Sequence, residues 1–165
     1  MESWAVPVFA VLTVALWLLA RPGSDRKWKL ASATALASAA VALLVNQLLA
    51  KIWHRARPYQ AHQHVHVWGA RSHDPSFPSD HASAAFGIAY AVFLYDRLAG
   101  ALFLAGAAAI AIGRVVVGVH YPGDVAAGAL VGLGSALLVF RARGLLAPLV
   151  GLVERVTDPV LARVR

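Results

Sequence analysis

Residues 30–50 read LASATALASAAVALLVNQLLA, a stretch of 21 residues that contains no charged side chain. A helix rises about 1.5 Å per residue, so this stretch would cross a hydrocarbon layer about 30 Å thick. The whole chain has a matching composition, with 59% hydrophobic and 14% charged residues among 165 and a mean hydropathy of +0.64. These values indicate a membrane protein and exclude a collagen-like or disordered chain.

Apolar stretches recur along the chain and predict an all-α integral membrane bundle of about five transmembrane helices. They cover residues 4–20, 30–50, 82–95, 100–119 and 125–140. The first is expected to be a retained anchor, because no basic residue precedes it. The segment 145–164 carries charges that would be costly in hydrocarbon, so we expect a C-terminal helix along the interface. Residues 1–165 are therefore interpreted as one membrane-embedded domain.

The basic residues predict the orientation of this bundle. The net charge is +7, but the cations lie in short loops between apolar stretches, which favours anionic lipid over nucleic acid as the partner. Five spans place ten Lys and Arg residues on one side and five on the other, so the richer side is expected to face the cytoplasm. The polar segment 51–79 would then lie outside. The chain has no cysteine, which excludes disulfides and thiolate metal sites.

Three polar motifs are expected to meet at that outer face. They are Lys51-Ile-Trp-His-Arg-Ala-Arg57-Pro58, Phe77-Pro-Ser-Asp-His-Ala-Ser-Ala-Ala-Phe-Gly87 and Arg114-Val-Val-Val-Gly-Val-His120-Tyr-Pro-Gly-Asp124. Pro58 predicts the end of the preceding helix, and Ser79 is a natural N-cap for the next one. Snorkelling cations or isolated loop histidines would explain each motif alone, but their convergence on one surface favours a functional site.

The residue types in these motifs suit phosphate chemistry. Lys51, Arg57, Arg114 and a fourth candidate, Arg55, together with a capped helix N-terminus would bind a multiply charged oxyanion. One histidine oriented by a carboxylate can act as a nucleophile, and a second can protonate the leaving oxygen. The arginines would supply the charge stabilisation that Mg²⁺ gives elsewhere, so no metal and no cofactor are expected.

The order and spacing of the three motifs resemble the type 2 phosphatidic acid phosphatase superfamily, which includes vanadium haloperoxidases and bacterial acid phosphatases. The resemblance spans residues 51–124. It implies that His120 is the nucleophile that forms a phosphohistidine, that Asp124 orients it, and that His81 is the acid for the leaving group. It also implies a set of phosphate-binding residues, namely Lys51, Arg57, Ser79 and Arg114. The sequence Ser-Phe-Pro-Ser-Asp-His-Ala further resembles small bacterial undecaprenyl-diphosphate phosphatases.

Two residues depart from the family pattern. Only five residues separate Lys51 from Arg57, where the family has six, and Asp80 stands where most members have glycine. We expect the Asp80 carboxylate to turn away from the phosphate toward a cation such as Arg55 or Arg71.

Two weaker patterns complete the set of candidate features. The alternating His62, His64 and His66 could hold a metal but are more typical of exposed loop residues. Gly128 and Gly132 have the spacing of closely packed helices.

The resulting hypothesis is a multi-pass protein of the bacterial inner membrane whose site faces the periplasm or exterior. It would hydrolyse undecaprenyl diphosphate to the monophosphate. Phosphatidylglycerophosphate, phosphatidate and a phosphorylated lipid sugar remain alternative substrates. A lipid or anion transporter and a catalytically silent scaffold are the competing classes.

Overall fold

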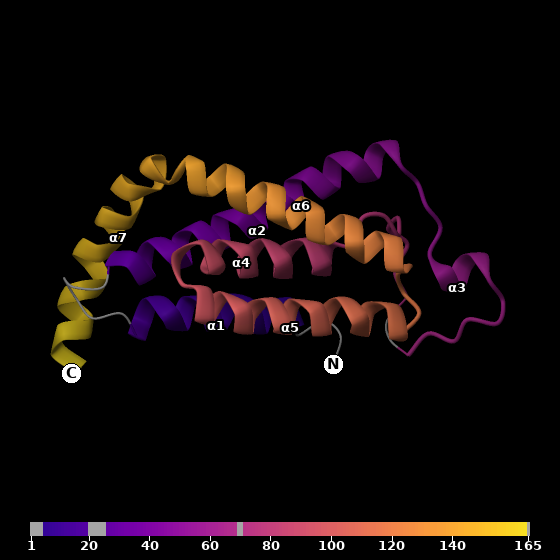
Figure 1. Ribbon diagram of the computed structural model, residues 1–165, viewed down its shortest axis with the longest axis horizontal. Helices are drawn as coiled ribbons and strands as arrows, with labels where there is room; N and C mark the ends of the chain where they lie inside the picture. Colours follow the sequence, from indigo (N-terminus) through magenta and orange to yellow (C-terminus); the bar gives the residue numbers. More distant parts are fainter. Residues whose placement is uncertain (1–4, 20–25, 69–70, 165) are drawn as a thin grey trace.

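The computed structural model describes residues 5–19, 26–68 and 71–164. Every regular element within these ranges is helical, which confirms the all-α class. The helices are α1 (Ala5–Leu19), α2 (Arg26–Ile52), α3 (Pro58–Ala61), α4 (Asp80–Tyr95), α5 (Arg97–Val116), α6 (Pro122–Arg141) and α7 (Arg143–Val164). Most of them lie along the long axis of the molecule, while α3 is a single turn within the loop at one end (Figure 1).

The predicted apolar stretches correspond to α1, α2, α4, α5 and α6. Within the described part of the chain, α2, α5 and α6 are long and apolar enough to cross a membrane, whereas α1 and α4 are shorter, with 15 and 16 residues.

The ends of α5 differ from the prediction by about one helical turn. The helix begins at Arg97 because the Asp96 carboxylate accepts a hydrogen bond from the Ala99 amide at 3.0 Å, as an N-cap does. It ends at Val116 rather than Val119, just before Gly118, whose φ of 80° is incompatible with a continued right-handed helix.

Helix α4 lies at the centre of the bundle and contacts α1, α2, α5 and α6. The approach of α6 is close because two of its glycines, Gly128 and Gly132, face α4. A Cβ atom on Gly132 would lie 2.6 Å from the Gly87 nitrogen, and one on Gly128 would lie 2.9 Å from the Ala82 Cβ. The prediction that this glycine pair packs helices together is therefore confirmed within the chain.

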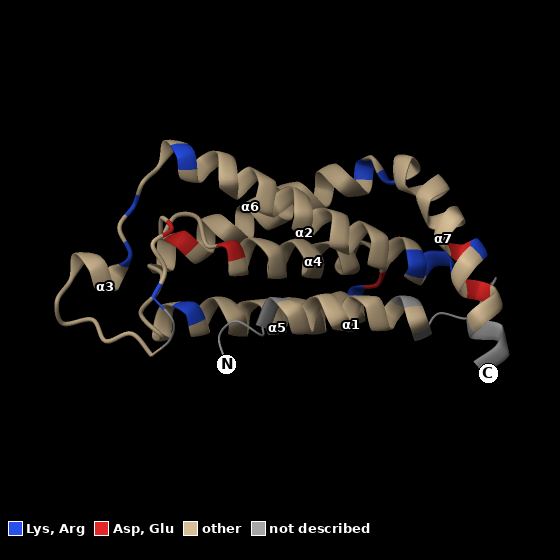
Figure 2. Cartoon of the chain, turned by 180° about the vertical axis from the view of Figure 1, so that it is seen from behind, with Lys and Arg blue, Asp and Glu red and all other residues tan. Residues whose placement is uncertain are grey.

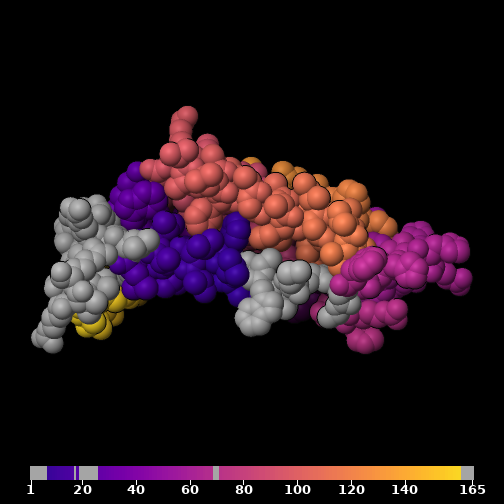
Figure 3. Space-filling view, turned by 90° about the horizontal axis from the view of Figure 1, so that it is seen from below, coloured from indigo at the N-terminus to yellow at the C-terminus, as the bar shows by residue number. Residues whose placement is uncertain are grey.

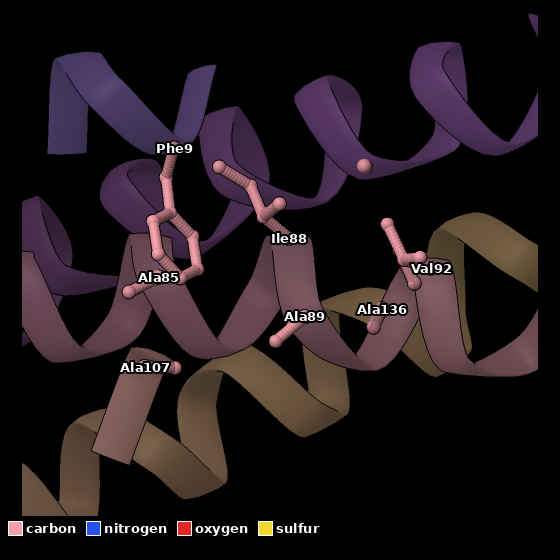
Figure 4. Close-up of a cluster of buried hydrophobic side chains, with 9 residues drawn as sticks. Phe9, Ala85, Ile88, Ala89, Val92, Ala107 and Ala136 are labelled. Atoms are coloured by element: carbon pink, nitrogen blue, oxygen red, sulfur yellow. The ribbon is translucent and has the colours of Figure 1, made fainter. Parts of the chain in front are cut away.

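The buried core is built mainly from alanines, with a few larger side chains (Figure 4). The ring of Phe9 on α1 enters it and meets Phe103 on α5 at a centroid distance of 5.3 Å. Ile88 and Val92 on α4 fill the space between the helices. This small-residue core sets the close helix spacing that brings the ends of α2, α4, α5 and α6 together.

Helix α7 lies across the end of the bundle that is opposite α3 (Figures 1 and 3). It is fixed there by Lys29 of α2, whose side chain is only 1% exposed and bonds both Asp158 carboxylate oxygens at 2.6 and 2.8 Å. Glu154 lies 3.7 Å from the same ammonium group. This placement agrees with the predicted interfacial helix.

Charged residues gather toward the two ends of the helices (Figure 2). The end that carries α3 has five cations, which are Lys51, Arg55, Arg57, Arg71 and Arg114. The described cations near the other end are Arg26, Lys27, Lys29, Arg97, Arg141, Arg143, Arg155 and Arg163. Arg21 and Arg165, which were counted on that side, lie outside the described residues. The bundle therefore has the predicted asymmetry, and its orientation in the cell stays a prediction.

Candidate active site

A cavity of about 510 Å³ opens at the end of the bundle that carries α3. Its wall is formed by the last turns of α2, the segment before α4, the first turn of α4 and the connection between α5 and α6. Five of the predicted site residues line it, and they are Lys51, Arg57, His81, Arg114 and His120. The three sequence motifs thus meet at one cavity.

His120 lies in the short connection between α5 and α6, and it is 4% exposed. Its Nδ1 is 2.8 Å from the Ser76 carbonyl oxygen. A carbonyl can only accept a hydrogen bond, so Nδ1 carries the proton and the lone pair of the neutral ring is on Nε2. The geometry therefore leaves the unprotonated nitrogen on the side of Arg57, whose Nη1 is 3.4 Å away.

The surroundings of His120 favour its neutral form. Burial, as the largest cause, and the positive charges of Arg57 and Arg114 together lower the pKa of His120 to about 4. The Ser76 carbonyl and Asp124 raise the pKa of His120, but by less than burial and the two arginines lower it. At neutral pH the ring is therefore an unprotonated base.

Asp124, in the first turn of α6, lies behind His120 and is fully buried. Its Oδ2 accepts hydrogen bonds from the Ser76 hydroxyl at 2.5 Å and from the Tyr121 amide at 2.9 Å. The same oxygen is 3.8 Å from Nδ1 of His120, too far for a direct hydrogen bond. Asp124 is linked to the histidine through its hydrogen bond to the Ser76 hydroxyl and by its charge at 3.8 Å, and the orienting role that the resemblance implies stays a prediction.

The cations differ in how firmly they are held. Arg57 is buried, donating from Nε to the Asp74 carbonyl at 2.9 Å and from Nη1 to the Val119 carbonyl at 3.3 Å. Arg114 lines the cavity from the last turn of α5. Lys51 is exposed in the last turn of α2, and it still lines the cavity despite its shortened spacing.

The start of α4 contributes His81 and a capped N-terminus. The Ser79 hydroxyl accepts from the Ala82 amide at 3.4 Å, and the Ser79 amide donates to the Asp124 carbonyl at 3.1 Å. Ser79 is buried, and it is not among the residues that line the cavity. The structure therefore gives it a capping contact, while its predicted contact with phosphate stays a prediction.

The prediction that the Asp80 carboxylate pairs with a cation is wrong. Its Oδ1 accepts a hydrogen bond from the Asn46 amide of α2 at 2.7 Å, and Asn46 also bonds the Ser83 hydroxyl at 2.9 Å. The predicted cation Arg55 is bonded to Asp124 at 2.9 Å instead. Close packing of α2 against α4 places the buried amide opposite Asp80, so no cation is needed.

Ser76 and Asn46 were not among the predicted site residues. Ser76 carries the network behind His120, and Asn46 positions Asp80 at the wall of the cavity. Both left a signal in the sequence, because Ser76 begins the Ser-Phe-Pro-Ser-Asp-His motif and Asn46 interrupts an apolar helix.

The histidine row at residues 62, 64 and 66 does not converge on a metal site. No group of three His, Asp or Glu side chains suited to a metal ion occurs within the described ranges. The His62 ring instead faces Tyr121 at a centroid distance of 6.3 Å.

Comparison with known proteins gives consistent matches. The sequence profile of the PAP2 superfamily matches residues 27–146. Undecaprenyl-diphosphatase BcrC of Bacillus subtilis (strain 168) is 31% identical over 159 residues, which are 96% of this chain and 80% of that protein. The bacitracin transport permease protein BcrC of Bacillus licheniformis is 42% identical over 106 residues, which are 62% of this chain and 52% of that protein.

One solved structure has a similar fold. The transmembrane PAP2 type phosphatidylglycerolphosphate phosphatase from Bacillus subtilis superposes with a TM-score of 0.58. The match covers 84% of this chain and 68% of that one. At 22% identity, this likeness supports the helical arrangement alone.

Proposed function

The chain belongs to the PAP2 superfamily, and we propose that it is a membrane lipid phosphatase that hydrolyses undecaprenyl diphosphate to the monophosphate. The observation that carries the phosphatase proposal is the position of His120, whose Nε2 lies beside Arg57 in a cavity shared with His81. The substrate is inferred from the Bacillus subtilis relative, whose similarity extends over 96% of this chain.

In the proposed reaction, Nε2 of His120 attacks the terminal phosphorus of the diphosphate. The bond from that phosphorus to the bridging oxygen breaks, and His81 gives a proton to the departing lipid phosphate. Water then attacks the phosphohistidine, the bond from phosphorus to Nε2 breaks, and His81 takes the proton of the water. Arg57, Arg114 and Lys51 bind the phosphoryl oxygens through both steps.

The buried position of Asp124 suits the covalent step. Phosphorylation at Nε2 leaves the Nδ1 proton in place and makes the ring positively charged. A buried carboxylate 3.8 Å from Nδ1 stabilises that charge without taking up the proton itself. The Ser76 carbonyl keeps the ring in the same orientation before and after attack.

Transport is the competing class, because it appears in the name of the Bacillus licheniformis relative. The charged residues of the described bundle lie near the helix ends, which gives a substrate no charged path through the middle. A histidine nucleophile beside a second histidine also has no use in passive transport. Phosphate release distinguishes the two classes directly.

The test is release of inorganic phosphate by the purified protein in detergent with EDTA present. The panel contains undecaprenyl diphosphate, undecaprenyl monophosphate, phosphatidate and phosphatidylglycerophosphate. We expect the diphosphate to give the highest kcat/KM, and activity to persist in EDTA. A higher kcat/KM for a phosphomonoester would replace the substrate assignment. No release from any of the four lipids would refute the phosphatase proposal.

A further inference from the structure

We propose that Arg55 is a positioning residue, which holds the Asp124 carboxylate in place behind His120. The proposal rests on the proposed function, since it concerns the same site. It differs from the sequence-based expectation that Arg55 is a fourth phosphate-binding cation. Arg55 does not line the cavity, although its neighbours His54 and Arg57 do.

Three contacts fix Arg55 on the far side of the catalytic histidine. Its Nη1 donates to Oδ1 of Asp124 at 2.9 Å, and its guanidinium carbon lies 4.0 Å from the centre of the Tyr121 ring. Its backbone carbonyl accepts from the Ser76 amide at 2.8 Å. The guanidinium is thus held by both a charge and an aromatic face, a geometry that favours arginine over lysine.

Burial explains why Asp124 needs this partner. The Asp124 side chain is 0% exposed, whereas that of Arg55 is 41% exposed. A buried carboxylate is costly unless it is paired and hydrogen-bonded, while a half-exposed guanidinium keeps much of its hydration. The pair therefore stabilises the ionised carboxylate at little cost to the arginine.

The contact also divides the two carboxylate oxygens between separate tasks. Arg55 occupies Oδ1, so Oδ2 remains directed at the Ser76 hydroxyl and the Tyr121 amide. Ser76 in turn holds Nδ1 of His120 through its carbonyl. Without Arg55 the carboxylate can rotate, which weakens its bond to the Ser76 hydroxyl and thereby loosens the carbonyl that holds His120.

A positioning role and a phosphate-binding role predict different kinetics. A cation that contacts the phosphate contributes to substrate binding, so its loss raises KM and weakens inhibition by vanadate, a phosphate analogue. A residue that acts through Asp124 changes the chemical step, so its loss lowers kcat and leaves KM and the vanadate Ki nearly unchanged.

The first experiment compares Arg55→Gln and Arg55→Lys with Arg71→Gln as the matched control. Arg71 lies on the same loop but has no contact with Asp124, and its guanidinium carbon lies 6.0 Å from the Tyr59 ring centre. We expect Arg55→Gln to lower kcat about 10-fold to 100-fold, the size typical of a lost outer hydrogen-bond partner. Arg55→Lys should recover part of the loss, and Arg71→Gln should behave as wild type.

Two results would overturn the proposal. One is a rise in KM and in the vanadate Ki with kcat unchanged, which would make Arg55 a phosphate-binding residue. The other is equal behaviour of Arg55→Gln and Arg71→Gln.

A double-mutant cycle tests whether Arg55 acts through the carboxylate. In an Asp124→Asn background, adding Arg55→Gln should lower the residual kcat by less than about twofold, because the partner is already lost. An undiminished effect of Arg55→Gln in that background would contradict the assigned path.

A measurement without turnover separates this proposal from the proposed function. Diethylpyrocarbonate modifies neutral histidine, and mass spectrometry gives the rate at His120 in each variant. We expect the rate in Arg55→Gln to differ at least about threefold from the rates in wild type and Arg71→Gln. Equal rates would refute positioning by Arg55, even if the wild-type protein released no phosphate from any lipid.

Discussion

The His120 ring is held by the Ser76 carbonyl at 2.8 Å, whereas Asp124, its predicted orienting partner, lies 3.8 Å from Nδ1. The Ser76 carbonyl carries no charge to be titrated, so its hold on the tautomer of the neutral ring does not itself depend on pH. Asp124 supplies negative charge near the ring without accepting its proton. In the proposed reaction, the orienting and the charge-stabilising tasks are thus divided between two groups.

Removal of the imidazole gives the first prediction. His120→Ala should lower kcat more than about a thousandfold while the protein stays folded, because the proposed covalent bond to phosphorus forms at Nε2 of this ring and charge alone cannot replace it. His64→Ala is the control, since it removes an exposed loop histidine away from the cavity. Phosphate release and thermal unfolding in detergent are the two measurements. Activity within tenfold of wild type would exclude His120 as the nucleophile.

The pH dependence gives the second prediction. The reactive form of His120 is neutral, and the pKa of His120 is lowered to about 4. Activity should therefore persist as the pH falls through 6.5, the ordinary pKa of histidine. The acidic limb of the pH profile, where protonation of His120 lowers kcat/KM, should lie near pH 4. The measurement is kcat/KM for one substrate between pH 3.5 and about pH 8.

A variant tests whether the nearby positive charges set the pH at which activity falls. Arg57→Gln removes one of the positive charges that lower the pKa of His120, so the acidic limb should move to higher pH. The ionisation of the substrate is the same for both proteins and cancels in the comparison. A limb that stays in place would contradict the electrostatic explanation.

At the scale of the helices, close packing of α4 and α6 gives the third prediction. A Cβ at Gly132 would come within 2.6 to 3.0 Å of three backbone atoms on α4, which cannot move aside easily. Gly132→Ala should therefore destabilise the protein by about 1–3 kcal/mol, as overpacking does. Gly134→Ala on the same helix meets no atom within 4 Å and should be neutral or slightly stabilising. Thermal unfolding of both variants in detergent measures the difference.

The helices could be predicted from sequence because each is a long apolar stretch, and their ends could not because each end depends on a local contact. The start of α5 is fixed by the Asp96 cap and its end by Gly118, and neither contact changes the average hydropathy. Hydropathy thus predicts a span, and single polar residues decide its first and last turns.

The site residues could be predicted as a group, whereas their pairings could not. Spacing within each motif brings His120, His81 and the cations to one end of the bundle. The pairs Arg55 with Asp124 and Asn46 with Asp80 join residues 69 and 34 positions apart. Such contacts depend on the path of the loop and on how α2 packs against α4, which no single motif contains.

At the scale of the whole molecule, the two ends of the bundle have different chemical tasks. The cations at the cavity end are arranged around the site, and Arg57 and Arg55 are bonded to carbonyl and carboxylate groups there. At the other end, Lys29 fixes α7 across the helices. Lys27 at the same end is bonded to Asp96 at 3.2 Å. A face rich in Lys and Arg is expected to lie against the anionic head groups of the cytoplasmic leaflet.

The last prediction therefore concerns orientation in the cell. The chain contains no cysteine, so single cysteines can be placed at Gln63, an exposed residue of the loop at the cavity end, and at Gly144, an exposed residue near the start of α7. A Cβ at Gly144 meets no atom within 4 Å, which makes this substitution sterically harmless. A membrane-impermeant maleimide added to intact cells should label Gln63→Cys and should label Gly144→Cys only after permeabilisation. The reverse pattern would place the cavity in the cytoplasm. The substrate would then have to be a lipid phosphate of the inner leaflet, because the enzyme could not reach a carrier diphosphate on the outer one.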